Sequence, residues 1–240
     1  MTSIIRILLS GLLLVSMSSH AEIIERQYEG FKVWVDCELR GHIMYDYTIG
    51  KDTANLKRKS NFRIDKEVPA RCQQKSSSTY RINGKSVFDR GHSASYNHLE
   101  TSKLAASQSD YMTNIWPQHR VLNRGAMYQS EVIAECYREI EPLRIIGGPV
   151  TSIPPVNSDY FVSHGIHTPG AFWKILIRNN RAIAWVMPNT SEATKNKLDD
   201  YIVSVRYLEK LIGMQLPVPE HIKDLKPHQS WYIPKGCDLS

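Results

Sequence analysis

Short apolar segments predict most of the strands in this chain, and in two of them, residues 31–35 and 42–49, apolar and polar residues alternate. Such alternation places one face of a strand in the core. We predict strands at residues 31–35, 42–49, 143–146, 171–177 and 182–187. Asn179-Asn180 lies between the last two and predicts a hairpin turn, while Gly147-Gly148-Pro149 predicts a turn after the third. Residues 87–92 read as the end of a strand that runs into a loop.

Three other segments carry helical signals. A short helix is predicted at residues 97–107, an amphipathic helix at 123–140, and a third helix at 198–212 that ends at Gly213. Strands mixed with helices, without an alternating βαβ rhythm, indicate an α+β fold with an antiparallel sheet. No linker or repeat divides the chain, so we expect a single domain.

The first 21 residues are set apart from that domain. Arg6 is followed by an apolar run, Ile7–Val15, and then by Ser19-His20-Ala21. This order is typical of a secretory signal peptide that is cleaved after Ala21; the alternative is an N-terminal membrane anchor, for which the apolar run is short. We therefore predict residues 1–21 as signal peptide and 22–240 as the functional domain of a secreted or periplasmic protein, with no membrane segment in the mature form.

Charge and cysteine content extend this picture modestly. The chain has 30 basic and 24 acidic side chains, and removal of residues 1–21 takes away one arginine and no acid, which leaves a net charge of +5. A mild positive excess is compatible with a polyanionic partner. The four cysteines, Cys37, Cys72, Cys136 and Cys237, allow three disulfide connectivities after export, and we expect at least one bridge, with Cys237 the first candidate.

Candidate chemistry is concentrated in two clusters. The first is Asp89-Arg90-Gly91-His92, and the second is Asn114-Ile115-Trp116-Pro117-Gln118, followed by Asn123 and Glu131. In an extended segment residues i and i+2 share a face, so Arg90 and His92 can point the same way. On a helix, Asn123, Met127 and Glu131 would form one stripe. A cleft between the two would contain an imidazole, a guanidinium, an amide oxygen and a carboxylate.

These groups suit the hydrolysis of a phosphodiester bond. A neutral histidine can accept a proton from the attacking water near neutral pH. Mg²⁺ stabilises the charge that develops on the phosphate, and it needs only one or two protein oxygen ligands. An arginine can bind a phosphate through two parallel hydrogen bonds.

With these motifs the chain resembles the DNA/RNA non-specific endonucleases of the ββα-metal type, the group of the Serratia nuclease and endonuclease G. The resemblance implies that His92 is the general base, that Asn123 holds the metal, and that Glu131 acts on the metal through a water. It also implies catalytic roles for Arg90 and Asn114, and an upstream arginine that binds phosphate, for which Arg58 is preferred to Arg63. The resemblance extends loosely from Tyr45 to Trp185 and departs from the family at Ser95 and Met127, where proline and tryptophan are common.

Simpler interpretations exist for each motif. Alone, residues 89–92 could form a turn with Gly91 at positive φ, and Asn123 could be a helix N-cap. Gly91-His92-Ser93-Ala94-Ser95 approaches the nucleophile elbow of a serine esterase but lacks the final glycine. A catalytically idle nucleic-acid-binding module is the third alternative.

The combined pattern therefore predicts a Mg²⁺-dependent endonuclease, with Mn²⁺ as a possible substitute. Its substrates would be DNA and also RNA, cut without sequence preference because contacts to phosphates carry no base information. Arg58 lies in the basic run Lys57-Arg58-Lys59, which would add further contacts to the substrate backbone.

Overall fold

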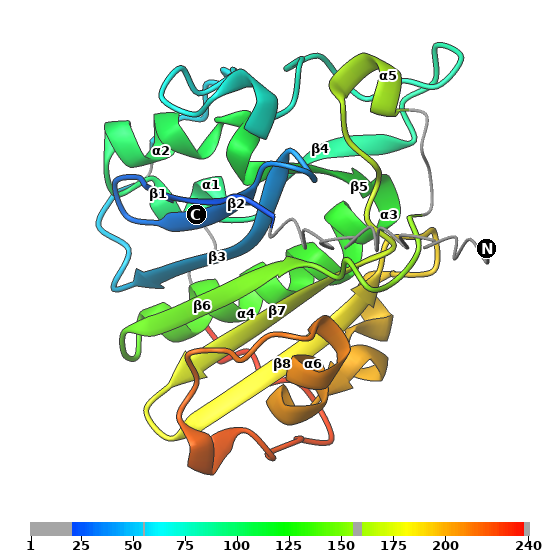
Figure 1. Cartoon of the computed structure of the whole chain (residues 1–240). Coiled ribbons are helices and arrows are strands. Elements are labelled where there is room, and N and C mark those ends of the chain that lie inside the picture. Colours follow the sequence, from blue (N-terminus) through cyan, green and yellow to red (C-terminus); the bar gives the residue numbers. More distant parts are fainter. Residues whose placement is uncertain (1–20, 55, 156–159, 238–240) are drawn as a thin grey trace, which may run out of the picture.

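A seven-stranded antiparallel sheet forms the centre of the molecule (Figure 1). The computed structural model describes residues 21–54, 56–155 and 160–237, so the predicted signal peptide lies outside the described residues except for Ala21. In spatial order the strands are β1 (Ile23–Gln27), β2 (Lys32–Asp36), β3 (Gly41–Ile49), β6 (Leu143–Pro149), β7 (Ala171–Arg178), β8 (Arg181–Pro188) and β9 (Ile202–Val203).

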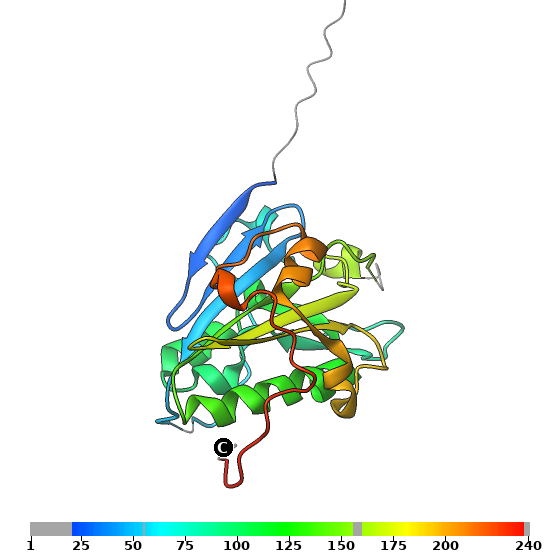
Figure 2. The ribbon, with the colours of Figure 1, turned by 90° about the horizontal axis from the view of Figure 1, so that it is seen from below.

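Helices cover both faces of this sheet, which is why its central strands are apolar on both sides (Figure 2). Helix α4 (Tyr128–Arg138) packs on one face, where Ile133 joins the same buried cluster as Leu176 of β7. Helix α6 (Val205–Ile212) packs on the other face, where Leu208 joins the cluster of Ile175. Since successive strand residues point to opposite faces, neighbouring residues of β7 serve different cores.

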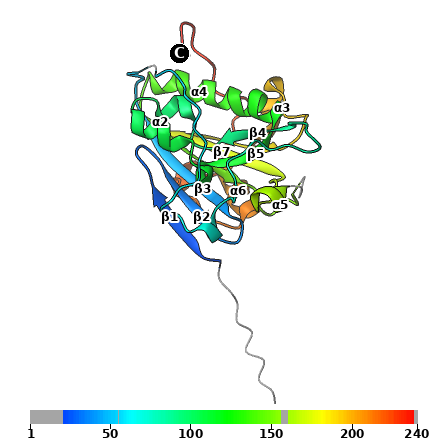
Figure 3. The same ribbon diagram turned by 90° about the horizontal axis from the view of Figure 1, so that it is seen from above.

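A second, two-stranded sheet carries the candidate chemistry. Strand β4 (Phe88–His92) pairs antiparallel with β5 (Ile115–His119). Between them lie α1 (Tyr96–Leu99), α2 (Lys103–Ser109) and the 3-10 helix η2 (Met112–Asn114). After β5 the chain passes through α3 (Arg120–Leu122) and a π-helical turn, η3 (Asn123–Met127), into α4, and Figure 3 shows this small sheet beside the start of that helix.

The remaining described elements are short. They are η1 (Ala70–Cys72), α5 (Tyr160–His164), η4 (Lys195–Tyr201) and η5 (Glu220–Ile222). Among the described residues no helix has both the length and the apolar character that a membrane span requires.

The α+β fold with an antiparallel sheet is confirmed, but some predicted boundaries are wrong. Gly147 and Gly148 belong to β6 and form no turn. Neither position has room for a side chain: a Cβ at Gly147 would lie 2.1 Å from the Tyr45 hydroxyl oxygen, and one at Gly148 would lie 2.2 Å from the Ile43 carbonyl oxygen. These glycines allow close packing inside a strand. The predicted helix at 198–212 is helical in α6 only from Val205, since η4 and β9 precede it, and it ends at Gly213 with φ 67° as expected.

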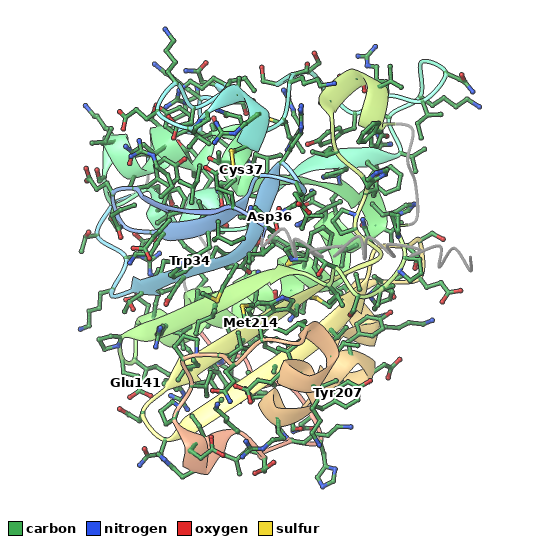
Figure 4. The ribbon with its side chains drawn as sticks, in the orientation of Figure 1. Trp34, Asp36, Cys37, Glu141, Tyr207 and Met214 are labelled. Carbon is green, nitrogen blue, oxygen red and sulfur yellow. A yellow bond between two sulfur atoms is a disulfide. The ribbon has the colours of Figure 1, made fainter. Side chains whose placement is uncertain are left out.

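All four cysteines form disulfides, in one of the three possible connectivities. Cys37 bonds to Cys72, and Cys136 bonds to Cys237. Figure 4 shows Cys37 at the end of β2. The second bridge joins the last turn of α4 to the C-terminal segment, so the expectation of at least one bridge involving Cys237 is confirmed.

Candidate active site

A cleft of about 660 Å³ opens between the β4–β5 sheet and the start of α4. Arg58, Arg90 and His92 line one side, and Asn123 and Glu131 line the other. We call these two sides the strand wall and the helix wall. The predicted stripe is only partly correct, because Met127 lies in the core while Asn123 and Glu131 reach the cleft.

Gly91 lies between two cleft residues because a side chain there has no space. A Cβ at Gly91 would lie 2.3 Å from Cδ of Gln118, whose side chain is fully buried against it from β5. Gly91 is a strand residue that pairs with Trp116, and its φ is not positive. The alternative of a turn at residues 89–92 is therefore wrong, and the two sequence clusters meet in one small sheet.

His92 is held by a carboxylate from outside both motifs. Its Nε2 donates to Oδ1 of Asp110 over 2.8 Å, and Asp110 also accepts the backbone N–H of Asn61 at 2.6 Å. Because a hydrogen bond at one ring nitrogen fixes the tautomer, Nδ1 carries the free lone pair. Nδ1 lies 3.4 Å from Nη2 of Arg58. The imidazole is therefore oriented with its basic nitrogen toward the cleft arginine.

The electrostatics of this pair favour a neutral imidazole beside an ionised acid. Burial lowers the pKa of His92 below its ordinary value, although the hydrogen bond to Asp110 opposes this shift. Burial acts to raise the pKa of Asp110, but the hydrogen bonds from His92 and from the Asn61 backbone outweigh it, and the pKa is lowered. A neutral His92 can accept a proton, which is the requirement for a general base.

The two arginines of the strand wall are held differently. Arg90 donates from Nη1 to the Ser77 carbonyl oxygen at 2.8 Å, and its guanidinium lies 3.9 Å from the centre of the Phe62 ring. Arg58 is exposed, with its guanidinium 5.2 Å from the Tyr96 ring centre. Arg90 is therefore fixed in position, whereas the Arg58 guanidinium is available to a ligand.

Arg63, the other candidate for the upstream arginine, does not line the cleft. It donates to the carbonyl and hydroxyl oxygens of Ser107 and stacks 4.0 Å from the ring centre of Tyr111. Of the two candidates for the upstream arginine, Arg58 lines the cleft and Arg63 does not.

On the helix wall, Asp89 fixes the amide of Asn123. Nδ2 of Asn123 donates to Oδ2 of Asp89 at 3.1 Å, and Arg124 forms two hydrogen bonds to the same carboxylate at 2.9 and 3.1 Å. Since Asp89 occupies the amide nitrogen, the amide oxygen is the atom left for a ligand. Asn123 opens the π-helical turn and accepts no N-cap hydrogen bond, so its interpretation as an N-cap is wrong.

Glu131 is half-buried and forms an ion pair with a lysine of the central sheet. Its Oε1 lies 3.5 Å from Nζ of Lys174, which is 1% exposed. Burial lowers the pKa of Lys174, and the charge of Glu131 acts against that shift. The backbone carbonyl oxygen of Glu131 lies 3.3 Å from Nε2 of His98.

His98 lines the cleft as a buried residue, and Asn114 lies outside it. Burial lowers the pKa of His98 to about 3, and its Nδ1 lies 2.8 Å from the Tyr47 hydroxyl. Asn114 is fully buried outside the cleft: its oxygen accepts from the Ala94 N–H, and its nitrogen donates to the Ala94 and Ser109 carbonyls. All of its amide atoms are used in holding the loop after His92, so a contact with substrate, as the family role implied, has no support here.

Sequence reasoning missed Asp110, Arg124 and Lys174, and it gave no role to Asp89. Asp110 had no local pattern to mark it, since it lies 18 residues from its partner His92. Lys174 carried a usable signal, because a charged residue inside the apolar run Ala171–Ile177 is expensive to bury without a partner. Of the two departures from the family pattern, Met127 is a core residue, whereas Ser95 is buried immediately before α1 and also lines the cleft.

The donor set of the helix wall fits a hard divalent cation. The amide oxygen of Asn123 and the carboxylate of Glu131 both line the cleft, and oxygen ligands of this kind suit Mg²⁺ or Mn²⁺. Two protein oxygens are enough where water and phosphate supply the rest.

Comparisons with known proteins place the chain in a family. The profile described as DNA/RNA non-specific endonuclease matches residues 14–218. A nuclease from Nostoc sp. is 32% identical over 169 residues, covering 66% of this chain and 60% of that protein. The mitochondrial nuclease of Saccharomyces cerevisiae is 26% identical over 184 residues, covering 68% and 55%. The chain thus spans somewhat more than half the length of these relatives.

A solved structure has the same fold. The crystal structure of the EndoG/EndoGI complex, described as showing the mechanism of EndoG inhibition, contains a chain that matches with a TM-score of 0.65 at 18% identity. The match covers 80% of this chain and 84% of that one. Since the family profile extends over most of the sequence, the chain belongs to the DNA/RNA non-specific endonuclease family.

Proposed function

We propose that this protein is a secreted or periplasmic endonuclease that hydrolyses phosphodiester bonds of DNA and RNA and depends on a divalent cation, Mg²⁺ or in its place Mn²⁺. The observation that carries the proposal is the cleft in which Arg58, Arg90 and His92 face Asn123 and Glu131. Family membership supports the nuclease activity, and the two disulfides support an oxidising compartment.

In this proposal His92 takes the proton of the attacking water at Nδ1. Asp110 keeps Nε2 protonated and stabilises the imidazolium that results, as the acid of a catalytic triad does. Arg58 lies 3.4 Å from Nδ1, so a phosphate that binds this guanidinium would be next to the base and would also draw the arginine away from the lone pair. Arg90, fixed by Ser77, would bind the same phosphate from the other side of the strand wall.

The cation would be held by the amide oxygen of Asn123, with Glu131 acting through a water. When bound, it would act as a Lewis acid that stabilises the negative charge of the phosphate and of the leaving oxygen. Asp89 orients Asn123 by accepting from its amide nitrogen. The strand-wall groups would contact the phosphate and would not need to contact the edges of the bases, so cleavage would be independent of sequence.

The decisive experiment is digestion of plasmid, single-stranded DNA and RNA by purified protein lacking residues 1–21, with Mg²⁺ and with EDTA. We expect cleavage of all three substrates with Mg²⁺ and loss of cleavage with EDTA. An idle binding module would release no product in either condition. Cleavage that continues in EDTA would contradict the proposal.

The serine esterase alternative has no structural support. Gly91 and His92 lie in β4, Ser93 is buried behind them, and the pairings between described strands are all antiparallel. A nucleophile elbow needs a strand–turn–helix unit on a parallel sheet with an exposed serine.

A further inference from the structure

Lys174 is an unusual residue for its position. It lies in the middle of β7, whose residues from Ala171 to Ile177 are all buried, and it is the charged residue in that apolar run. Alternation along the strand places it on the same face as Phe172 and Leu176, which belong to the cluster under α4. A buried ammonium is costly unless a carboxylate accompanies it, so its partner should reveal its purpose.

That partner is Glu131 on the helix wall. Nζ of Lys174 lies 3.5 Å from Oε1 of Glu131, and among the described residues it has no hydrogen bond. The carboxylate therefore stands between a buried cation below it and the open cleft above it. His98 holds the backbone of the same residue through its carbonyl oxygen, so Glu131 is anchored at two points from the interior.

We propose that Lys174 is a positioning residue that holds Glu131 by one carboxylate oxygen and so keeps it in the outer shell of the bound cation. This inference rests on the proposed function, because it concerns the metal site of that nuclease. Without Lys174 the negative charge of the carboxylate would have no positive partner beneath it, and the carboxylate would be free to approach the cation directly. Two consequences follow: the cation binds more tightly, and Glu131 no longer orients the water on which turnover depends.

The test is Lys174→Met, which removes the charge with an unbranched side chain only one heavy atom shorter. Leu176→Met is the matched control, since it changes a fully buried residue on the same face of the same strand without changing charge. Binding of Mn²⁺ to each protein is measured by electron paramagnetic resonance without nucleic acid, at pH 8, together with kcat and KM for plasmid cleavage at saturating Mg²⁺.

For Lys174→Met we expect Mn²⁺ affinity to rise about 5-fold, as loss of a nearby unit charge through a high effective dielectric implies. We expect kcat to fall roughly 10–100-fold, the usual range for residues that orient metal ligands, with KM unchanged. Leu176→Met should change neither quantity. A purely structural role would instead lower affinity and turnover together, and that result would overturn the inference.

A double substitution tests whether Lys174 acts through Glu131. Lys174→Met should cause no further loss of kcat in a Glu131→Gln background, because the carboxylate that it positions is already absent. Additive losses would overturn the inference. These failures are distinct from failure of the proposed function, which would appear as a wild-type protein that cleaves nothing or cleaves equally well in EDTA.

Discussion

The two walls of the cleft are built on different principles. On the strand wall, a base and two cations line the cleft, and the base is anchored by an acid, Asp110. On the helix wall, an amide and an acid face the cleft; the amide is anchored by Asp89 and the acid by a cation, Lys174. His92, Asn123 and Glu131 are thus each held by a partner from outside their own element. The comparison teaches that the motif residues supply the chemistry, while their partners supply the orientation.

The largest effect should come from removing the base of the strand wall. We expect His92→Ala to lower kcat about 10²–10⁴-fold, the usual contribution of general-base catalysis, and to leave duplex binding unchanged. Plasmid cleavage and a binding titration measure the two quantities, with His167→Ala as a control outside the cleft. Near-normal cleavage by the His92 variant would show that another residue is the general base.

On the helix wall, Asn123→Ala should be almost as damaging. At a fixed Mg²⁺ concentration we expect a loss of more than about 100-fold, because a direct ligand matters more than an outer-shell residue such as Glu131, whose substitution by alanine should cost about 10–100-fold. Activity is measured against Mg²⁺ concentration, and excess Mg²⁺ should partly rescue Asn123→Ala. Identical Mg²⁺ titrations for wild type and this variant would refute the assignment.

The anchor of the strand wall gives a pH signature. Activity needs neutral His92, so kcat/KM should rise with pH through a pKa below the ordinary value of about 6.5. Asp110 raises the pKa of His92, so Asp110→Asn should move this acid limb to still lower pH and lower the plateau roughly 10²-fold. A pH–rate profile measures both effects. An acid limb that stays in place or moves upward would show that Asp110 does not act on His92.

Substrate contacts by the strand wall should appear in the salt dependence of binding. Arg58→Ala should flatten the plot of log K against log salt by about 0.9 on duplex DNA, the contribution of one phosphate contact, and equally for unrelated sequences. Arg63→Ala is the matched control, since Arg63 lies outside the cleft and contacts Ser107. The measurement uses the His92→Ala protein across a salt series. If the Arg63 variant changes the slope and the Arg58 variant does not, the two assignments are exchanged.

The smallest effect on turnover should come from the bridge behind the helix wall. Cys136 and Cys237 close a loop of 101 residues, for which loop entropy suggests a stabilisation of about 4.7 kcal/mol. Replacing both by serine should lower the free energy of unfolding but leave kcat nearly unchanged, because Cys136 lies away from the cleft. Chemical denaturation and plasmid cleavage test the two halves. Intact mass with and without reduction should reveal two disulfides in exported protein, and four free thiols would contradict that expectation.

Sequence patterns predicted the parts of the molecule that local physics determines. Short apolar segments predicted β2, β3, β7 and β8, and the Asn179-Asn180 turn gave the hairpin correctly, with Asn179 at φ 45°. Strand β5 was missed because Trp116-Pro117-Gln118 contains a proline, a residue that argues against the interior of a strand. The helix predicted at 198–212 is too long, because residues 198–203 belong to η4 and β9.

The site divides in the same way. The residues that face the cleft, His92 and Asn123 among them, lie within motifs whose spacing is visible in the sequence. Their anchors are brought in by tertiary folding, and Lys174 reaches Glu131 from a strand 43 positions later. Asn114 was assigned to catalysis because it opens a motif, whereas its amide is occupied by the backbone around Ala94. Spacing identifies which residues are grouped, but only packing reveals which way each one points.

The contact between Gly91 and Gln118 constrains how this protein can diverge. Any side chain at position 91 would collide with the buried amide of Gln118. Position 91 can therefore be substituted only after the residue at position 118 has become smaller. A shorter residue at 118 would in turn leave a void beneath the strand that carries His92. We therefore expect the two positions to be substituted together. Substitutions should be rare at Gly91, although this glycine performs no chemistry.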